Sequence, residues 1–252
     1  MQLFNNGQHM CLAFRDLVPG DEAVQANQFL IFDNKHAALI DPGGDMIYSQ
    51  LFMAISEHIN VRNLDYVVAS HQDPDIVASL DKWLVGTNAT IVVPELWQRF
   101  IPHFTRPGKW SGRIMTMPDE GTRLELGSIE LLALPAHFMH AEGNFQFYDP
   151  LSRILFSGDL GANLAPAPEL DEPARTLEQV LPYLDGFHKR YINGNRVCRF
   201  WASMVRQLDI DMIAPQHGRA LVGDAIAEFI DYVETLQCGI DLMDQQDYRI
   251  PA

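Results

Sequence analysis

Residues 66–75 read YVVASHQDPD, and this stretch decides how the rest of the sequence is interpreted. Tyr66–Ser70 is apolar with valines at its centre, which predicts a short buried strand. That strand ends at His71, and Asp73 and Asp75 follow in an H-x-D-x-D pattern. Imidazole and carboxylate groups directly after a rigid strand are typical of metal-binding loops. In an acidic protein the same pattern can also be an ordinary polar turn.

Three further predicted strands end in residues of the same chemical type. Ile129–Leu134 leads into His137 and His140, Ile154–Phe156 into Asp159, and Met212–Ala214 into His217. Taken alone, Asp159 could cap a turn and His217 could be a hydrogen-bonded loop histidine. Loops beyond strand ends can converge on one point, and charged groups there are costly to bury without an opposite charge. The four clusters together therefore favour a site for two metal ions.

The remaining pattern alternates strands with helices and indicates an α/β (α+β) sandwich with sheets inside and helices outside. Further strands are expected at Phe29–Phe32, Ala37–Ile40 and Ala89–Val93, and helices at Met46–Glu57, Thr176–Leu184, Cys198–Leu208 and Ala225–Leu236. No repeat or low-complexity tract is present, and the proline-bearing breaks at 106–108 and 165–168 do not mark a domain boundary. We expect one domain over residues 1–252.

Composition narrows the classes of function. The chain has 252 residues, 47% of them hydrophobic, and a formal net charge of -15, which argues against a nucleic-acid partner. No apolar run approaches the roughly 18–20 residues of a membrane span, and Met1–Met10 does not resemble a secretion signal, so a cytoplasmic location is expected. Cys11, Cys198 and Cys238 are odd in number and far apart, which argues against disulfides and against a thiolate zinc site.

The order of these clusters resembles the metallo-β-lactamase superfamily. The resemblance rests on His71-x-Asp73-x-Asp75, then His140, then Ser157-Gly158-Asp159, then Gln216-His217-Gly218. It spans the chain from the Phe29–Asp41 hairpin to at least Leu221. It implies an αββα sandwich with the metal site at one edge of the two sheets.

Two departures from the superfamily pattern bear on the metal. Zinc hydrolases of this superfamily usually carry H-x-H-x-D-H, whereas here Asp73 replaces the second histidine and Ile76 the last. The resulting oxygen-rich donor set suits iron or manganese better than zinc. The first loop is similar to the H-x-E-x-D of flavodiiron proteins. The segment His140–Pro150 resembles the oxygen-binding di-iron proteins, a branch of the same family, still more closely.

That resemblance implies a ligand set. One iron would take His71, Asp73 and His140, the other Asp75 and His217, and Asp159 would bridge them, with an oxo or hydroxo bridge and with manganese or zinc as alternative metals. Alignment of the following Gly-Asn-Phe segment favours His140 over His137, which becomes a candidate hydrogen-bond partner of a ligand. No catalytic residue is expected outside the metal centre. Ile76, Phe138, Met139 and Phe145 are candidates for an apolar wall of the site, although ordinary core is the default for such residues.

No Gly-rich or Ser/Thr-rich phosphate loop is present, so no flavin site is expected in this chain. The sequence therefore predicts a di-iron protein that binds or senses O₂ or another small diatomic ligand, with slow reduction as a variant of that function. Two alternatives stay open: an O₂ or NO reductase served by an external electron donor, and a metal-dependent hydrolase of a phosphodiester or thioester. Whether the protein is an enzyme is undecided; an oxidoreductase is favoured over a hydrolase. A redox or signalling protein partner and a homodimer are the expected protein contacts.

Overall fold

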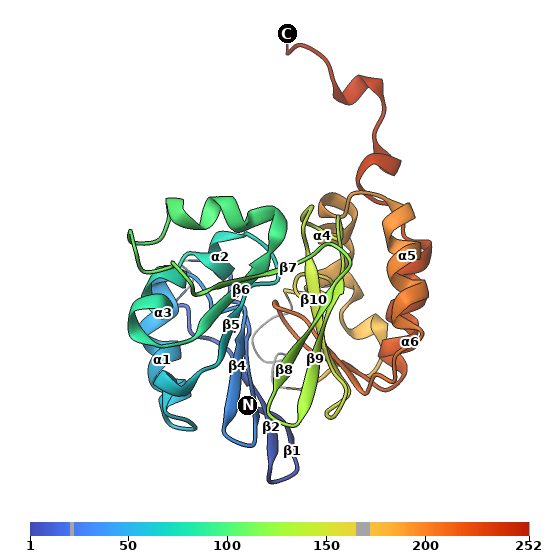
Figure 1. Cartoon of the computed structure of the whole chain (residues 1–252). Coiled ribbons are helices and arrows are strands. Elements are labelled where there is room, and N and C mark those ends of the chain that lie inside the picture. The colour runs from blue at the N-terminus through green and yellow to red at the C-terminus, as the bar shows by residue number, and fades with distance from the viewer. Residues whose placement is uncertain (21–22, 165–171, 252) are drawn as a thin grey trace.

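The computed structural model describes residues 1–20, 23–164 and 172–251. Two β-sheets lie face to face in the middle of the molecule, and helices cover the outer face of each sheet (Figure 1). The first half of the chain, blue to green, builds one sheet with its helices, and the second half, green to red, builds the other. This arrangement confirms the predicted αββα sandwich.

The first sheet contains seven strands of the described chain, and they lie side by side in chain order. They are β1 (Gln2–Asn5), β2 (His9–Phe14), β3 (Gln28–Asp33), β4 (His36–Ile40), β5 (Tyr66–Val68), β6 (Thr90–Pro94) and β7 (Ile114–Met117). The strands β1 to β4 are antiparallel, whereas β4 to β7 are parallel. Parallel neighbours require crossover connections. These contain α1 (Tyr48–Ser56), α2 (Pro74–Val77), α3 (Leu80–Gly86) and the 3₁₀ segments η1 (Asp45–Ile47), η2 (Val61–Asn63) and η3 (Glu95–His103).

The second sheet contains six strands of the described chain in the order β13-β12-β11-β10-β9-β8. Their bounds are β8 (Thr122–Leu126), β9 (Ile129–Pro135), β10 (Phe145–Asp149), β11 (Ile154–Phe156), β12 (Met212–Ala214) and β13 (Leu221–Val222). Only the β11–β12 pair is parallel in this sheet. Its long crossover contains η5 (Leu177–Gln179), α4 (Leu181–Tyr191) and α5 (Asn195–Val205), and α6 (Asp224–Thr235) follows β13.

Apolar side chains fill three layers. Phenylalanines fill the space between the sheets, where the rings of Phe29 and Phe156 lie 4.9 Å apart across the interface. Trp83 packs α3 against the outer face of the first sheet, and Trp201 and Phe229 join α5 and α6 to the outer face of the second. Burying each such ring contributes about 1.5–3 kcal/mol, so both sheets are fixed on both faces.

The predicted strands are present within one or two residues of their expected bounds, and α1 and α6 match the helices expected at Met46–Glu57 and Ala225–Leu236. The helix expected at Thr176–Leu184 is wrong in position, because the α-helix runs from Leu181 to Tyr191. Pro182 explains the late start, since proline has no N–H to donate and fits the first turn of a helix. The helix expected at Cys198–Leu208 begins earlier, at Asn195, and ends at Val205.

After α6 the chain first packs against the residues that precede α5, because the Ile240 N–H donates to the Asn193 oxygen and the Asn195 N–H donates to Asp241. This part contains the short segment η6 (Gly239–Leu242), and the end of the chain, with η7 (Gln245–Asp247), then extends outward (Figure 1). None of the helices in the described ranges has the length and apolar character that crossing a bilayer requires. The proline-bearing break at 165–168 falls outside the described residues.

Candidate metal centre

The six predicted ligands come from loops that leave the two sheets at one edge. His71 follows β5, and the loop then turns into the short helix α2, whose N-cap residue is Asp73 and whose first turn contains Asp75. Pro74 at the start of α2 explains this abrupt turn, because its fixed φ suits a first helical position. The other three ligands follow strands of the second sheet: His140 lies between β9 and β10, Asp159 after β11, and His217 after β12.

Four of these side chains form a first group. His140 Nε2 lies 2.9 Å from Asp73 Oδ2, and His71 Nε2 lies 3.7 Å from the same oxygen. Asp159 Oδ2 lies 3.8 Å from His71 Nε2 and 3.6 Å from His140 Nε2. Ligand atoms about 2.1 Å from one metal ion stand about 3.0–3.5 Å from each other, so these separations lie within a few tenths of an ångström of those in a coordination shell. The four residues form a cluster that could hold a metal ion.

The remaining two side chains form a second group on the other oxygen of Asp159. His217 Nε2 lies 3.5 Å from Asp159 Oδ1 and 3.4 Å from Asp75 Oδ2. Gln216 Nε2 donates a hydrogen bond of 3.2 Å to the same Asp75 oxygen. The carboxylate of Asp159 therefore presents one oxygen to each group.

Two buried atoms of the predicted ligands have no hydrogen-bond partner among the described residues. They are His71 Nε2 and Asp159 Oδ1, on side chains that are 1% and 5% exposed. A buried polar atom without a partner is costly, and native proteins rarely tolerate one without an ion or a water. Cations between the two groups would satisfy both atoms, so the residues present fit a pair of metal ions.

A hydrogen-bond chain fixes the orientation of His71. Ser70 Oγ donates to Asp41 Oδ2 at 3.0 Å, and the Ser70 backbone N–H donates to Asp41 Oδ1 at 2.8 Å. Since the hydroxyl proton of Ser70 is used in this way, its oxygen accepts from His71 Nδ1, 3.0 Å away. This leaves the Nε2 lone pair of His71 facing the first group. His217 is held similarly, because its Nδ1 donates to the backbone oxygen of Gln25 at 2.7 Å.

Asp41 was not predicted as a site residue. It is buried, burial raises its pKa to about 6, and its backbone φ of 53° is in the left-handed region. In the sequence, the only sign of a role for Asp41 was that this carboxylate directly follows a strand. Its distance of 29 residues from Ser70 hides the contact from any local pattern.

The imidazoles and carboxylates of the centre change one another's pKa values. The hydrogen bond from His140, with the nearby His71, holds the pKa of Asp73 well below its usual range. Burial disfavours the charged form of His217, but the adjacent Asp159 outweighs it and raises the pKa of this imidazole to about 9. Metal ions bound between these groups would displace the proton of His217.

A pocket of about 740 Å³, here called the metal pocket, opens onto the centre. Five of the six predicted ligands line it, all except His71. Its outer wall includes Val24, Leu164, Tyr183, Phe187, Arg190 and Tyr191. Tyr183, Phe187 and Tyr191 follow one another at intervals of four residues, which places them on one face of α4. The rings of Phe187 and Tyr191 stack 4.7 Å apart, and Tyr191 lies 5.4 Å from the ring of His140.

The apolar wall expected at Ile76, Phe138, Met139 and Phe145 is wrong. Ile76, Met139 and Phe145 are buried in the core, Phe138 is 43% exposed, and none of the four lines the metal pocket. Helix α4 takes their place, because the crossover from β11 to β12 packs it over this edge of the second sheet. His137 likewise lies apart from the ligands: its Nε2 bonds the backbone oxygen of Asp119 at 2.8 Å.

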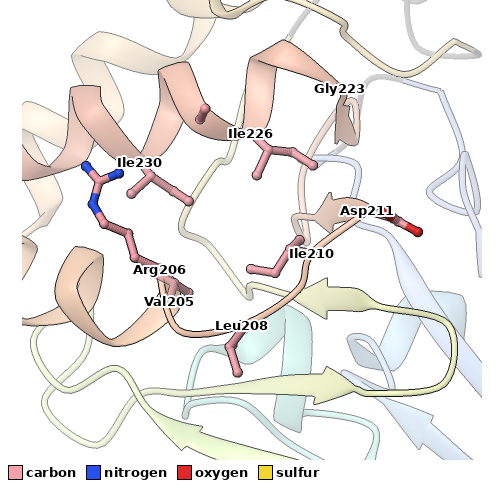
Figure 2. Close-up of a pocket in the computed structure, with 9 residues that line it drawn as sticks. Val205, Arg206, Leu208, Ile210, Asp211, Gly223, Ile226 and Ile230 are labelled. Carbon is pink, nitrogen blue, oxygen red and sulfur yellow. The ribbon is translucent and has the colours of Figure 1, made fainter.

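A separate pocket of about 580 Å³ lies in the outer helical layer of the second sheet (Figure 2). Val205, Leu208, Ile210, Ile226 and Ile230 give it an apolar floor between α5 and α6. Arg206 on its rim is paired with Asp231 and Glu234. No predicted ligand lines this pocket, so it is separate from the candidate metal centre.

Two solved structures of known proteins are similar to this chain. A solved structure of a peroxy diiron species of the chemotaxis sensor ODP is 36% identical, with a TM-score of 0.85 over 96% of this chain and 97% of that chain. A flavo di-iron protein variant from Thermotoga maritima shares the fold, with 20% identity and a TM-score of 0.75 over 93% of this chain and 61% of that chain.

Among curated proteins, an uncharacterized protein of Methanocaldococcus jannaschii is 27% identical over 194 residues, which cover 76% of this chain and 48% of the relative. The chain spans about half or less of the length of the curated relatives that it matches. The model of the family described as "ODP family beta lactamase" matches residues 24–218. The chain therefore belongs to the ODP family of the metallo-β-lactamase fold.

Proposed function

We propose that this protein binds O₂ at a pair of iron ions held by His71, Asp73, Asp75, His140, Asp159 and His217. In this assignment His71, Asp73 and His140 hold one ion, Asp75 and His217 hold the other, and Asp159 bridges them. One observation carries the assignment: the two carboxylate oxygens of Asp159 face two separate groups, at 3.6–3.8 Å on one side and 3.5 Å on the other.

The donor chemistry supports iron over zinc. Three imidazoles and three carboxylates offer more oxygen and fewer nitrogen donors than the H-x-H-x-D-H loop of zinc hydrolases. Asp73 is the residue that makes the difference, since it stands where those enzymes carry a second histidine and contacts both His140 and His71. The net charge of -15 also favours the uptake of cations.

When bound, a reduced iron pair supplies an electron-rich centre with open positions that O₂ can occupy. The residues of the chain prepare that centre. The Asp41–Ser70 pair keeps the proton of His71 on Nδ1, and Gln25 does the same for His217. The Phe187–Tyr191 stack shields the His140 side from bulk water. The similar ODP structure, which contains a peroxy diiron species, supports O₂ as the ligand.

A second candidate function is reduction of O₂ or NO with electrons from an external donor. Exposed aromatic rings on α4 lead from the surface to His140 and offer a contact surface for such a donor. A redox or signalling protein partner, a homodimer and a cytoplasmic location are parts of this proposal.

The test combines metal analysis with an anaerobic optical titration. Purified protein should contain about two irons per chain, and its visible spectrum should change when the dithionite-reduced form meets O₂. Asp159→Asn should lose both properties, whereas Asp119→Asn, at an exposed carboxylate outside the centre, should keep them. A colourless protein that contains only zinc would overturn the proposal. Rapid, repeated turnover with an added donor would favour the reductase, and cleavage of a chromogenic phosphodiester would favour the hydrolase.

A further inference from the structure

A second, much smaller cavity adjoins the metal centre at His71. Its volume is about 30 Å³, and its lining includes Ala69, His71, Val93, Trp97, Phe100 and Phe104. We call it the rear cavity. Of the six proposed ligands, His71 alone lines the rear cavity, and His71 is also the one that does not line the metal pocket. The rear cavity therefore adjoins the metal centre through His71, whose Nε2 lies 3.7 Å from Asp73 Oδ2.

The wall of the rear cavity presents only apolar atoms. Among the described residues, Gln72 Oε1 and Trp97 Nε1 are buried without a hydrogen-bond partner, but neither atom contributes to the surface of the cavity. A buried water needs two to four polar partners, and this wall offers none. The volume nevertheless exceeds the roughly 10–15 Å³ that a single water requires. The rear cavity is therefore dry and large enough for one small apolar molecule.

Exposure changes from one end of the rear cavity to the other. Ala69 and Val93 are 0% and 1% exposed, whereas Phe100 and Phe104 are 52% and 38% exposed. Phe100 lies in η3, and Phe104 directly follows η3. The cavity thus extends from two aromatic side chains at the surface to the buried face of His71. Rotation of an exposed ring requires no change in the sheet, so it can admit a small molecule.

We propose that the rear cavity docks an apolar diatomic gas, O₂ or NO, next to the metal centre. Uncharged diatomic molecules are poorly hydrated and partition from water into dry apolar spaces, as xenon does in protein cavities. The metal pocket, in contrast, is much larger and is lined partly by carboxylates, which water solvates well. The inference rests on the proposed function in one respect, since the metal centre is the destination of the gas.

Xenon is the probe that tests the docking site without iron. Crystals of the metal-free protein under xenon pressure should show a xenon peak between Val93 and His71. Val93→Ile adds one methylene group to the cavity and should abolish this peak. Val92→Ile makes the same change on the same strand, but Val92 packs between the two sheets, so the peak should persist. Absence of xenon from the wild-type cavity would overturn the proposal.

A kinetic measurement tests the passage of O₂. In the iron-loaded, reduced protein, Val93→Ile should slow O₂ association several-fold at unchanged iron content, and Val92→Ile should not. An unchanged association rate in Val93→Ile would also overturn the proposal. If iron-loaded protein did not react with O₂, the proposed function would fail, and the xenon peak would still decide whether the cavity binds apolar gas. Unfolding midpoints of both variants show whether either has lost its fold.

Discussion

The imidazole of His140 and the carboxylate of Asp73 meet at 2.9 Å although 67 residues separate them in the chain. The two residues come from different sheets, so this contact joins the first metal loop to the loop between β9 and β10. It also holds a carboxylate at the position where zinc hydrolases of this fold have an imidazole.

Replacement of Asp73 should therefore change the choice of metal. In Asp73→His the first group becomes richer in nitrogen, so the ratio of bound zinc to bound iron should rise. Protein from cultures supplied with both metals, analysed by inductively coupled plasma mass spectrometry, gives this ratio. Asp119→His is the matched control at an exposed aspartate. An iron content equal to that of the wild type would show that Asp73 does not govern metal selection.

Asp41 should control iron affinity without touching the metal. Asp41→Asn keeps the side-chain shape and tolerates the positive φ of 53°, but it weakens the acceptor of the Ser70 proton. His71 then loses its fixed proton position, and iron affinity should fall about 10–100-fold, as for other partners of metal-bound histidines. Competition with a calibrated chelator measures the change.

The conservative variant Ser70→Thr keeps a hydroxyl group beside Asp41 and should retain most of the affinity. If Asp41→Asn bound iron as tightly as the wild type, the hydrogen-bond chain through Ser70 would be structural only. Thermal unfolding of the metal-free variants shows whether a loss of iron affinity comes from a less stable fold, because this measurement reports the fold without the metal.

A buried imidazole joins the two sheets at the other end of β10. His9 Nε2 lies 2.7 Å from Asp149 Oδ2 and His9 Nδ1 lies 3.1 Å from Asp33 Oδ1, all on fully buried side chains. Burial opposes the charge of His9, but the two carboxylates outweigh it and raise its pKa. His9→Gln leaves two buried carboxylates without a cation, so the free energy of unfolding should fall by about 3–5 kcal/mol.

Urea unfolding measures this loss, and iron content should stay unchanged because His9 is remote from the metal loops. The exposed His36, which pairs with Asp65 at the surface, supplies the control. His36→Gln should cost no more than about 1 kcal/mol. Equal effects of the two substitutions would contradict the role of His9.

Residue types and their positions in loops after strands pointed to four polar clusters, and the family resemblance then selected the six candidate ligands, including His140 in place of His137. The partners of these residues were not predictable. Asp41 reaches Ser70 only because β4 and β5 are parallel neighbours, and His9 reaches Asp149 only because the two sheets face each other. Both contacts depend on packing between segments that are distant in sequence.

The wall of the metal pocket was mispredicted for the same reason. Phe138, Met139 and Phe145 lie close to His140 in the chain, but Met139 and Phe145 pack into the core instead of the pocket. Phe187 and Tyr191, which belong to α4 and lie more than forty residues later in the chain, pack beside His140 instead. Proximity in sequence was a poor guide, because the loop reverses direction at His140, whose φ is 136°.

A buried neutral histidine should make stability fall in mild acid. His188 Nε2 accepts the N–H of Gly161 at 2.9 Å, and His188 Nδ1 donates to the backbone oxygen of Leu184 at 2.8 Å. Burial lowers its pKa to about 4 in the folded state, against 6.5 as the ordinary value. The unfolded chain therefore binds a proton more readily between these two pH values, so this contribution to stability is complete above pH 6.5 and is lost as the pH falls towards 4.

The loss expected from His188 is about 3 kcal/mol across that interval. Urea unfolding of metal-free protein at several pH values between 7 and 4 measures it (the range follows from the two pKa values). Other groups titrate in the same range, so the difference between wild type and His188→Gln is the informative quantity. Glutamine can accept the Gly161 N–H without taking up a proton, and the stability of this variant should depend less on pH. Parallel pH profiles for the two proteins would show that His188 is not the titrating group.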